Sequence, residues 1–132
     1  MLRVDEEQED DLTPSDRKQL LNRITMIIAK KKIDVIVFED YDKGVIGKSL
    51  IESVVKLARQ KGIPIAVDPK KKNFNHYKNV TLFKPNLKEL REGMKIDLDK
   101  NKIEDISKAV NKLCNDNKID TALITLSEKG IF

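Results

Sequence analysis

The sequence predicts an α/β fold with three layers, in which helices cover both faces of a mostly parallel sheet. Two observations lead to this prediction. Short apolar runs that suit buried strands alternate along the chain with segments whose apolar residues recur at helical spacing. The helical segments are long enough to act as crossovers between parallel strands. The chain has 132 residues, the size of one domain, and 39% of them are hydrophobic, as in globular proteins.

The first predicted helix begins after Thr13. Thr13 can cap a helix, Pro14 suits the first helical position, and Asp16 suits the positive end of the helix dipole. Apolar residues then recur at helical spacing, and the three lysines at 30–32 suit the carboxyl end of the helix. The acidic run at 5–11 precedes this helix and is predicted to be a loop.

Residues 34–38 form the clearest predicted strand. Their apolar side chains are continuous rather than alternating, as expected of a strand that helices cover on both faces. A charged loop follows, which contains Asp40 and Lys43. Helical spacing then resumes at about residue 46 and ends before Gly62, so a crossover helix is predicted there.

Two further strands end in polar groups that contain proline. Residues 64–67 lead into Asp68-Pro69-Lys70, and residues 80–83 lead into Lys84-Pro85-Asn86. Proline has no N–H to donate to a sheet, so each proline marks the end of a strand.

The last third of the chain repeats the alternation of helix and strand. A short helix is predicted from Asn86 or Leu87 to near Gly93, followed by a loop. Helical spacing returns between Ile103 and Leu113, and residues 122–125 are predicted to form the last strand.

Polar side chains follow all four predicted strands. They are Asp40 and Lys43, Asp68 and Lys70, Lys84 and Asn86, and Thr125 and Ser127. The carboxyl ends of parallel strands meet at one edge of a sheet, which is where open α/β sheets bind ligands. These cations, carboxylates, amides and hydroxyls suit a phosphorylated ligand with a divalent metal better than they suit acyl transfer.

Some of these residues have simpler explanations. Asp68 before a proline is typical of a turn that ends a strand. Asn86 and Glu89 have the spacing of a capping box, which explains both residues without a ligand. His76 has no second histidine or cysteine beside it, so a surface or packing role is predicted. Cys114 is the only cysteine, which excludes an intramolecular disulfide, and its helical position predicts a place in the core.

Composition argues against nucleic-acid and membrane partners. The formal net charge is +4, but charges of both signs are spread along the chain and aromatic residues make up only 5%. No apolar run approaches the roughly 20 residues that span a bilayer. The amino terminus is too acidic for a signal peptide, so a cytoplasmic location is expected.

Four segments, taken in order along the chain, carry a resemblance to one protein family. The segments are Asp40-Tyr41-Asp42-Lys43-Gly44, Asp68-Pro69-Lys70 with Phe74 and Tyr77, Thr81 to Glu89, and Leu123 to Gly130. They resemble the corresponding segments of bacterial heptose-7-phosphate kinases, the kinase half of bifunctional ADP-heptose synthases. These enzymes are ribokinase-like or phosphofructokinase-B-like sugar kinases, and the resemblance covers nearly the whole chain.

The resemblance implies ATP-dependent phosphorylation of D-glycero-D-manno-heptose 7-phosphate at its anomeric hydroxyl, on the route to lipopolysaccharide. ATP and Mg²⁺ are the implied cofactors, the sugar phosphate is the implied partner, and a homodimer of the full-length protein is a further expectation. The implied site residues are Asn86 and Glu89 for metal and phosphate, Thr125, Ser127 and Gly130 for the nucleotide, Asp68, Lys70 and Lys84 near the phosphate, and Asp40 and Lys43 in a nearby loop.

Two family segments have no counterpart in the sequence. The family's catalytic aspartate lies in a Gly-Ala-Gly-Asp segment, and its sugar-binding segment near the amino terminus is rich in glycine; this chain has neither. We therefore expect residues 1–132 to be the central part of a single ribokinase-like kinase domain. We also expect this part alone to contain no catalytic residue and to be inactive.

The competing interpretation is a non-catalytic α/β module that binds a nucleotide or phosphate for regulation. A receiver-like domain would need an acid pair after its first strand. The acids near the amino terminus are followed by no apolar periodic segment before Pro14, which argues against that domain type.

Overall fold

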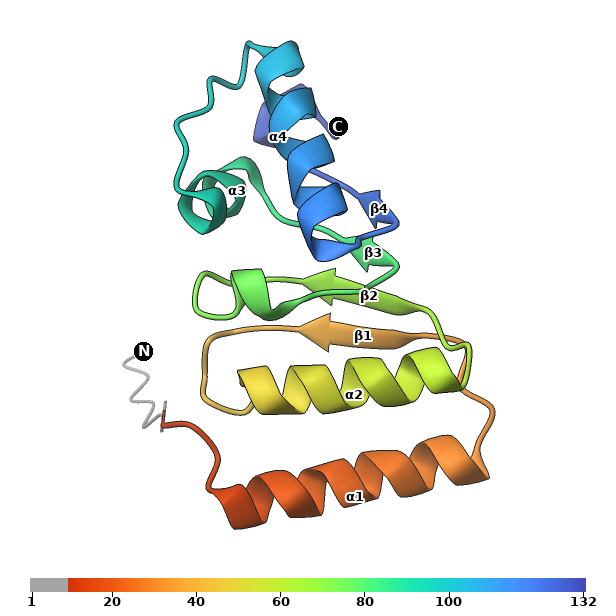
Figure 1. Cartoon of the computed structure of the whole chain (residues 1–132). Helices are drawn as coiled ribbons and strands as arrows, with labels where there is room; N and C mark the ends of the chain where they lie inside the picture. The colour runs from red at the N-terminus through yellow and green to blue at the C-terminus, as the bar shows by residue number, and fades with distance from the viewer. Residues whose placement is uncertain (1–9) are drawn as a thin grey trace, which may run out of the picture.

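The structure is a computed structural model that describes residues 10–132 (Figure 1). Its elements are α1 (Pro14–Lys30), β1 (Ile36–Glu39), α2 (Lys48–Gln60), β2 (Ile65–Asp68), the 3-10 helix η1 (Phe74–His76), β3 (Leu82–Phe83), α3 (Leu87–Met94), α4 (Ile103–Asn117), β4 (Thr121–Ala122) and the 3-10 helix η2 (Ser127–Lys129). Most of the predicted loop at 5–11 lies outside the described residues. None of the helices in residues 10–132 is long and apolar enough to cross a membrane.

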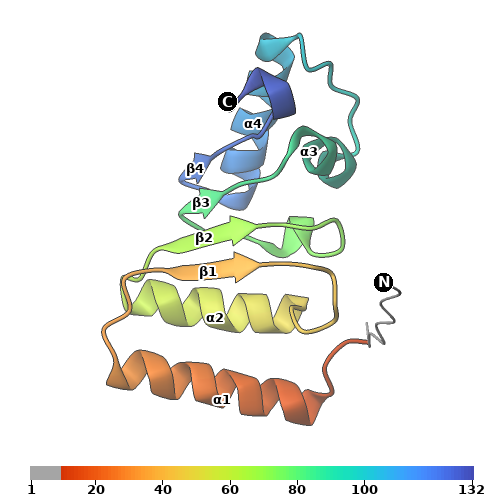
Figure 2. The ribbon, with the colours of Figure 1, turned by 180° about the vertical axis from the view of Figure 1, so that it is seen from behind.

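Within residues 10–132 the strands form one sheet in the order β1-β2-β3-β4, and every neighbouring pair is parallel. The predicted parallel α/β fold is therefore confirmed. Helices α1 and α2 lie at the β1 end of the sheet, whereas α3 and α4 lie at the β3–β4 end (Figures 1 and 2).

Strands β3 and β4 are shorter than predicted. The predicted strand at 122–125 contributes only its first residue to the regular ladder, and Thr125 joins the sheet through isolated bridges to Asn86 and Ile131. The ladder is interrupted because Pro85 has no N–H to donate. Pairing then resumes beyond it: the Thr125 N–H donates to the Pro85 carbonyl (3.2 Å).

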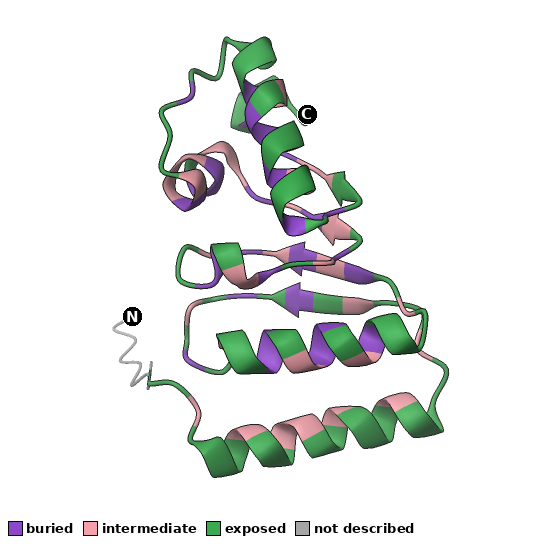
Figure 3. Cartoon of the chain, in the orientation of Figure 1, coloured by how far each residue is buried: buried purple, intermediate pink, exposed green. Residues whose placement is uncertain are grey.

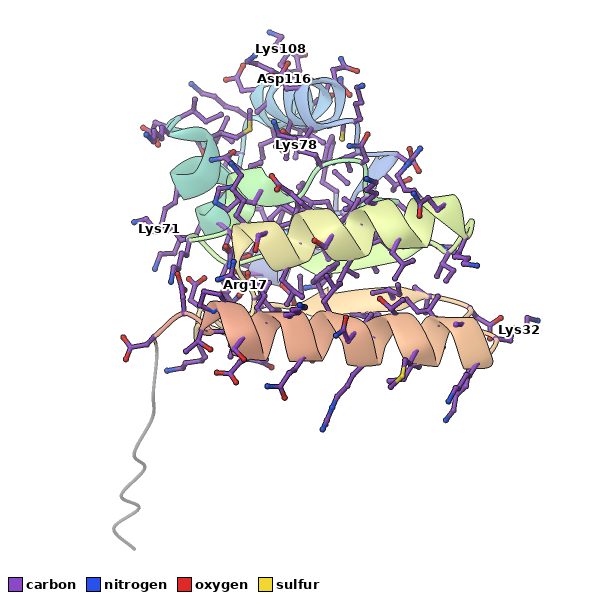
Figure 4. All side chains as sticks on the ribbon, turned by 60° about the horizontal axis from the view of Figure 1, so that its bottom comes forward. Arg17, Lys32, Lys71, Lys78, Lys108 and Asp116 are labelled. Carbon is purple, nitrogen blue, oxygen red and sulfur yellow. The ribbon has the colours of Figure 1, made fainter. Side chains whose placement is uncertain are left out.

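Helix α1 begins as its sequence predicts. The Thr13 side chain accepts a hydrogen bond from the Asp16 N–H (3.1 Å), and Pro14 occupies the first helical position. Arg17 then donates to the Ser49 hydroxyl (2.6 Å), which joins α1 to the first turn of α2. Figure 4 shows Arg17 between the two helices. The residues of α1 are half-buried or exposed, so this helix packs at the margin of the core.

The core lies between the sheet and the helices α2 and α4 (Figure 3). Phe74 and Tyr77, which belong to a segment that reads as a polar connection, are both fully buried. Their rings pack edge-on or tilted against Phe83, with centroids 5.1 and 6.1 Å apart. The connection after β2 is therefore folded over the sheet and closes the core near the carboxyl ends of the strands.

Burial of β1 alternates, which differs from the expectation that both of its faces are covered. Phe38 is 6% exposed, whereas Val37 is 61% exposed and Val35, just before the strand, is 48% exposed. The reason is that β1 is the outermost strand, and its outward residues have no helix over them among residues 10–132.

His76 and Cys114 are both half-buried. Cys114 packs against the core cluster, and burial raises the pKa of its thiol. The predicted packing roles of these two residues agree with these positions.

Candidate functional site

The carboxyl edge of the sheet brings the predicted phosphate-proximal residues together as two ion pairs. The Asp68 carboxylate at the end of β2 contacts the Lys84 ammonium just after β3, at 2.9 Å. The Lys70 ammonium, two residues beyond β2, contacts Glu89 in the first turn of α3, at 2.5 Å. Each carboxylate of this edge is thus held by a lysine from a neighbouring segment.

Asn86 and Glu89 form a complete capping box at the start of α3. The Asn86 side-chain oxygen accepts from the Glu89 N–H, and Glu89 Oε2 accepts from the Asn86 N–H, both at 2.8 Å. Glu89 is only 8% exposed. The capping explanation for this pair is therefore confirmed, and the box fixes where α3 leaves the sheet edge.

The electrostatics of this edge favour a charged Lys70. The hydrogen bond to Glu89 is the main cause that raises the pKa of Lys70, and burial opposes it; the charges of Asp68 and Asp42 act in the same direction as Glu89. The lysine is therefore a fixed cation at neutral pH. Tyr41, beside it, donates to Glu39 (2.7 Å), and this bond raises the pKa of the Tyr41 hydroxyl.

The oxygen atoms of Asn86 and Glu89 do not fit a metal site in this arrangement. Glu89 Oε1 is taken by Lys70, Glu89 Oε2 by the Asn86 N–H, and Asn86 Oδ1 by the Glu89 N–H. Across residues 10–132, no three His, Cys, Asp or Glu side chains gather closely enough to hold a metal ion. Mg²⁺ requires six oxygen ligands in octahedral geometry, which these occupied atoms do not offer.

The predicted nucleotide-binding residues lie beside this edge. Thr125 and Ser127 line a cleft of about 280 Å³ together with Asn86, at the start of α3. The Leu87 N–H donates to the Thr125 carbonyl (3.2 Å), which holds the two walls together. Gly130 does not line the cleft; its N–H donates to the Ser127 carbonyl (3.1 Å), and its φ of 85° suits glycine.

Asp40 does not face the open edge. It is 2% exposed, and its side chain accepts from the Tyr77 hydroxyl (2.8 Å), the Asn73 amide (3.0 Å) and the Asp42 N–H (3.0 Å). Lys43, three residues on, is exposed in the same loop. The structure thus separates this loop pair from the ion-paired edge and places Asp40 in a buried polar network.

Sequence reasoning missed the partners that define both clusters. Asn73 and Tyr77 were not expected to hold Asp40, and Lys70 was not expected to pair with Glu89. The available signal was the spacing of Phe74 and Tyr77 after Asp68-Pro69-Lys70, which is typical of a fixed turn rather than of a free loop.

Removing the cap of α3 should have a measurable cost in stability. Asn86→Ala removes the acceptor for the Glu89 N–H, and we expect the free energy of unfolding to fall by about 1 kcal/mol. Urea denaturation followed by circular dichroism measures this change. Lys102→Ala is the matched control, because Lys102 caps α4 without a side-chain hydrogen bond. Equal losses in the two variants would contradict a stabilising role for the box.

Comparison with known proteins gives both a sequence and a structural likeness. No family model matches the chain. The bifunctional protein HldE of Aliarcobacter butzleri is 33% identical over 132 residues, and that of Helicobacter pylori strain P12 is 37% identical over 131 residues. Each alignment covers 99% of the chain but only 27% and 28% of the relative, so the chain spans about a quarter of these proteins.

Solved structures share the fold. The tetrameric inhibited form of Escherichia coli phosphofructokinase-2 has a TM-score of 0.71 at 21% identity, with 92% of this chain and 39% of that chain covered. Arabidopsis thaliana ribokinase complexed with ribose and ATP has a TM-score of 0.60 at 19% identity, covering 92% of this chain and 35% of that chain. The predicted resemblance is confirmed: in sequence and fold, the chain is like part of a carbohydrate kinase.

Proposed function

We propose, from the premise that this chain shares its sequence with bifunctional HldE proteins and its fold with ribokinase-like sugar kinases, that it is part of a heptose-phosphate kinase. The reaction is the transfer of a phosphoryl group from ATP to the anomeric hydroxyl of D-glycero-D-manno-heptose 7-phosphate. The observation that carries the proposal is the likeness to HldE along 99% of the chain, together with the four ordered segments.

The charged edge supports a role in holding phosphate. Lys70 and Lys84 are held at the carboxyl ends of β2 and β3 by Glu89 and Asp68. Lysines fixed in this way can neutralise the charge of a phosphate group that approaches the edge. The cleft that contains Thr125 lies directly beyond Asn86, so a nucleotide there would direct its phosphates toward this edge.

The proposal gives each remaining site residue a role. Thr125, Ser127 and Gly130 shape the wall that approaches the nucleotide, whereas Asp40 fixes the loop that carries Lys43. Mg²⁺ accompanies the phosphates of ATP in this proposal, because the oxygen atoms of Asn86 and Glu89 are already hydrogen-bonded. The use of ATP suits an enzyme that works in the cytoplasm.

We further propose that residues 1–132 are the central part of the kinase domain and do not catalyse the reaction alone. Phosphoryl transfer to an alcohol uses a carboxylate placed to accept the hydroxyl proton. In the described part of the chain, Asp68 and Glu89 are ion-paired and Asp40 is surrounded by three donors. None of these three carboxylates is available as a base.

A coupled assay of ADP release tests the proposal. The longer protein that contains this chain should release ADP when heptose 7-phosphate, ATP and Mg²⁺ are present, and the 132-residue chain should be at least about a hundredfold slower. Fructose 6-phosphate and ribose are the comparison substrates. Preference for either would overturn the heptose assignment. ATP binding without any sugar-dependent release would instead support a regulatory module that binds nucleotides.

A further inference from the structure

The Lys70–Glu89 pair occupies the position where a divalent cation was expected. Glu89 is the acidic member of the capping box, its side chain is 11% exposed, and the Lys70 ammonium lies 2.5 Å from its Oε1 atom. The Lys70 side chain is 38% exposed, so it reaches the edge from the solvent side. The positive charge beside Glu89 is therefore supplied by the chain itself.

We propose that Lys70 is a positioning residue that holds Glu89 in the capping box, and that it competes with divalent cations for this carboxylate. The inference deepens the proposed function, because it assigns Lys70 a regulatory role at an edge that we propose binds phosphate. Its test needs no kinase activity, so it stands or fails separately from the proposed reaction.

The physical reason lies in the burial of Glu89. A carboxylate removed from water is stable only when a positive charge or several hydrogen bonds compensate it. The Asn86 N–H compensates one oxygen, and Lys70 compensates the other. Without Lys70, the second oxygen has no charged partner and attracts a cation from solution. A divalent cation that binds the native chain must first displace the ammonium.

Lys71 offers a matched control for the loss of one positive charge. It is adjacent in sequence, its side chain is 71% exposed, and its ammonium lies 3.8 Å from Glu92 rather than near Glu89. Figure 4 labels Lys71 at the periphery of the molecule. Lys71→Met therefore changes the net charge as Lys70→Met does, but leaves the Lys70–Glu89 contact intact.

Titration with Mn²⁺, followed by electron paramagnetic resonance of the free ion, tests the proposal on the chain itself. An opposite charge beside a carboxylate shifts its proton affinity by about one to three pKa units, so Lys70→Met should bind Mn²⁺ on the order of tenfold more tightly. Lys71→Met should stay within about twofold of the native chain, since exposed pairs contribute little. The double variant Lys70→Met with Glu89→Gln should lose the gain.

Two further results decide the matter. Lys70→Arg should restore the native Mn²⁺ affinity, because a guanidinium also pairs with a carboxylate. Equal Mn²⁺ affinity in Lys70→Met and Lys71→Met would overturn the proposal. If circular dichroism shows that Lys70→Met does not fold, Lys70→Gln replaces it, since glutamine is neutral but still donates a hydrogen bond. A native affinity in folded Lys70→Gln would equally overturn it.

Discussion

Replacing Asp40 by alanine should lower the free energy of unfolding by about 3 to 5 kcal/mol. The substitution removes the acceptor of three hydrogen bonds, from Tyr77, Asn73 and the Asp42 N–H. The Tyr77 hydroxyl is fully buried, and the Asn73 amide keeps only its bond to the Ile46 carbonyl (2.7 Å). A buried donor without an acceptor costs about 1 to 3 kcal/mol, so the losses accumulate.

The measurement is urea denaturation of the native and variant chains, with Glu39→Ala as the control. Glu39 is next in sequence but exposed, and its described side-chain partner is Tyr41. We expect that control to stay within about 0.5 kcal/mol of the native chain. A loss of less than about 1 kcal/mol for Asp40→Ala would contradict the buried network, because even one unpaired buried donor costs more.

The network also changes the acid–base behaviour of Tyr77. Burial, first, and then the hydrogen bond to Asp40 raise the pKa of the Tyr77 hydroxyl above its ordinary value. The neutral phenol therefore persists across the pH range in which proteins are usually handled. Its hydrogen bond to Asp40 anchors the segment after β2 to the loop after β1.

Gly93→Ala should cost about 3 kcal/mol, at the upper end of the range for overpacked cores. A Cβ atom at this position would overlap the ring of Phe74, which is fully buried. That ring packs against Phe83 (5.1 Å between centroids), so it has little room to move away. Helix α3 can therefore approach η1 closely only because residue 93 is glycine.

Thermal denaturation compares Gly93→Ala with Gly47→Ala. At Gly47 the φ angle is −130°, and among the described residues no atom lies within 4 Å of the added Cβ. The control should therefore keep its stability within about 0.5 kcal/mol. Adding Phe74→Leu to Gly93→Ala should recover part of the loss, because a smaller side chain vacates the overlap. Equal melting temperatures for the two alanine variants would contradict the close packing at Gly93.

The parts of the fold that local chemistry determines could be predicted from the sequence. The cap of α1 at Thr13, the proline-marked ends of β2 and β3, and the capping box at Asn86 depend on neighbours within four residues. Continuous apolar runs also identified the strands. Their burial could not be predicted in the same way, because the exposure of Val37 depends on which elements lie over β1.

The candidate site was predictable in place but not in detail. A parallel sheet places Asp68, Lys70 and Lys84 at one edge, whatever their side chains do. The direction of each side chain depends on long-range packing. Asp40 turns inward because Tyr77, 37 residues later, supplies a buried hydroxyl, and Lys70 is drawn to a glutamate 19 residues away. Sequence periodicity carries no information about such pairs.

The exposed outer side of β1 has a consequence for the behaviour of this chain at high concentration. In the described residues β1 pairs only with β2, so its other edge carries unpaired backbone donors and acceptors. Val35 and Val37 add an apolar surface beside that edge. A strand from a second molecule can add to such an edge, which is the usual first step of aggregation. Lys32 and Glu39, charged residues on either side, oppose that step, so solubility of this chain depends on them more than on its overall charge.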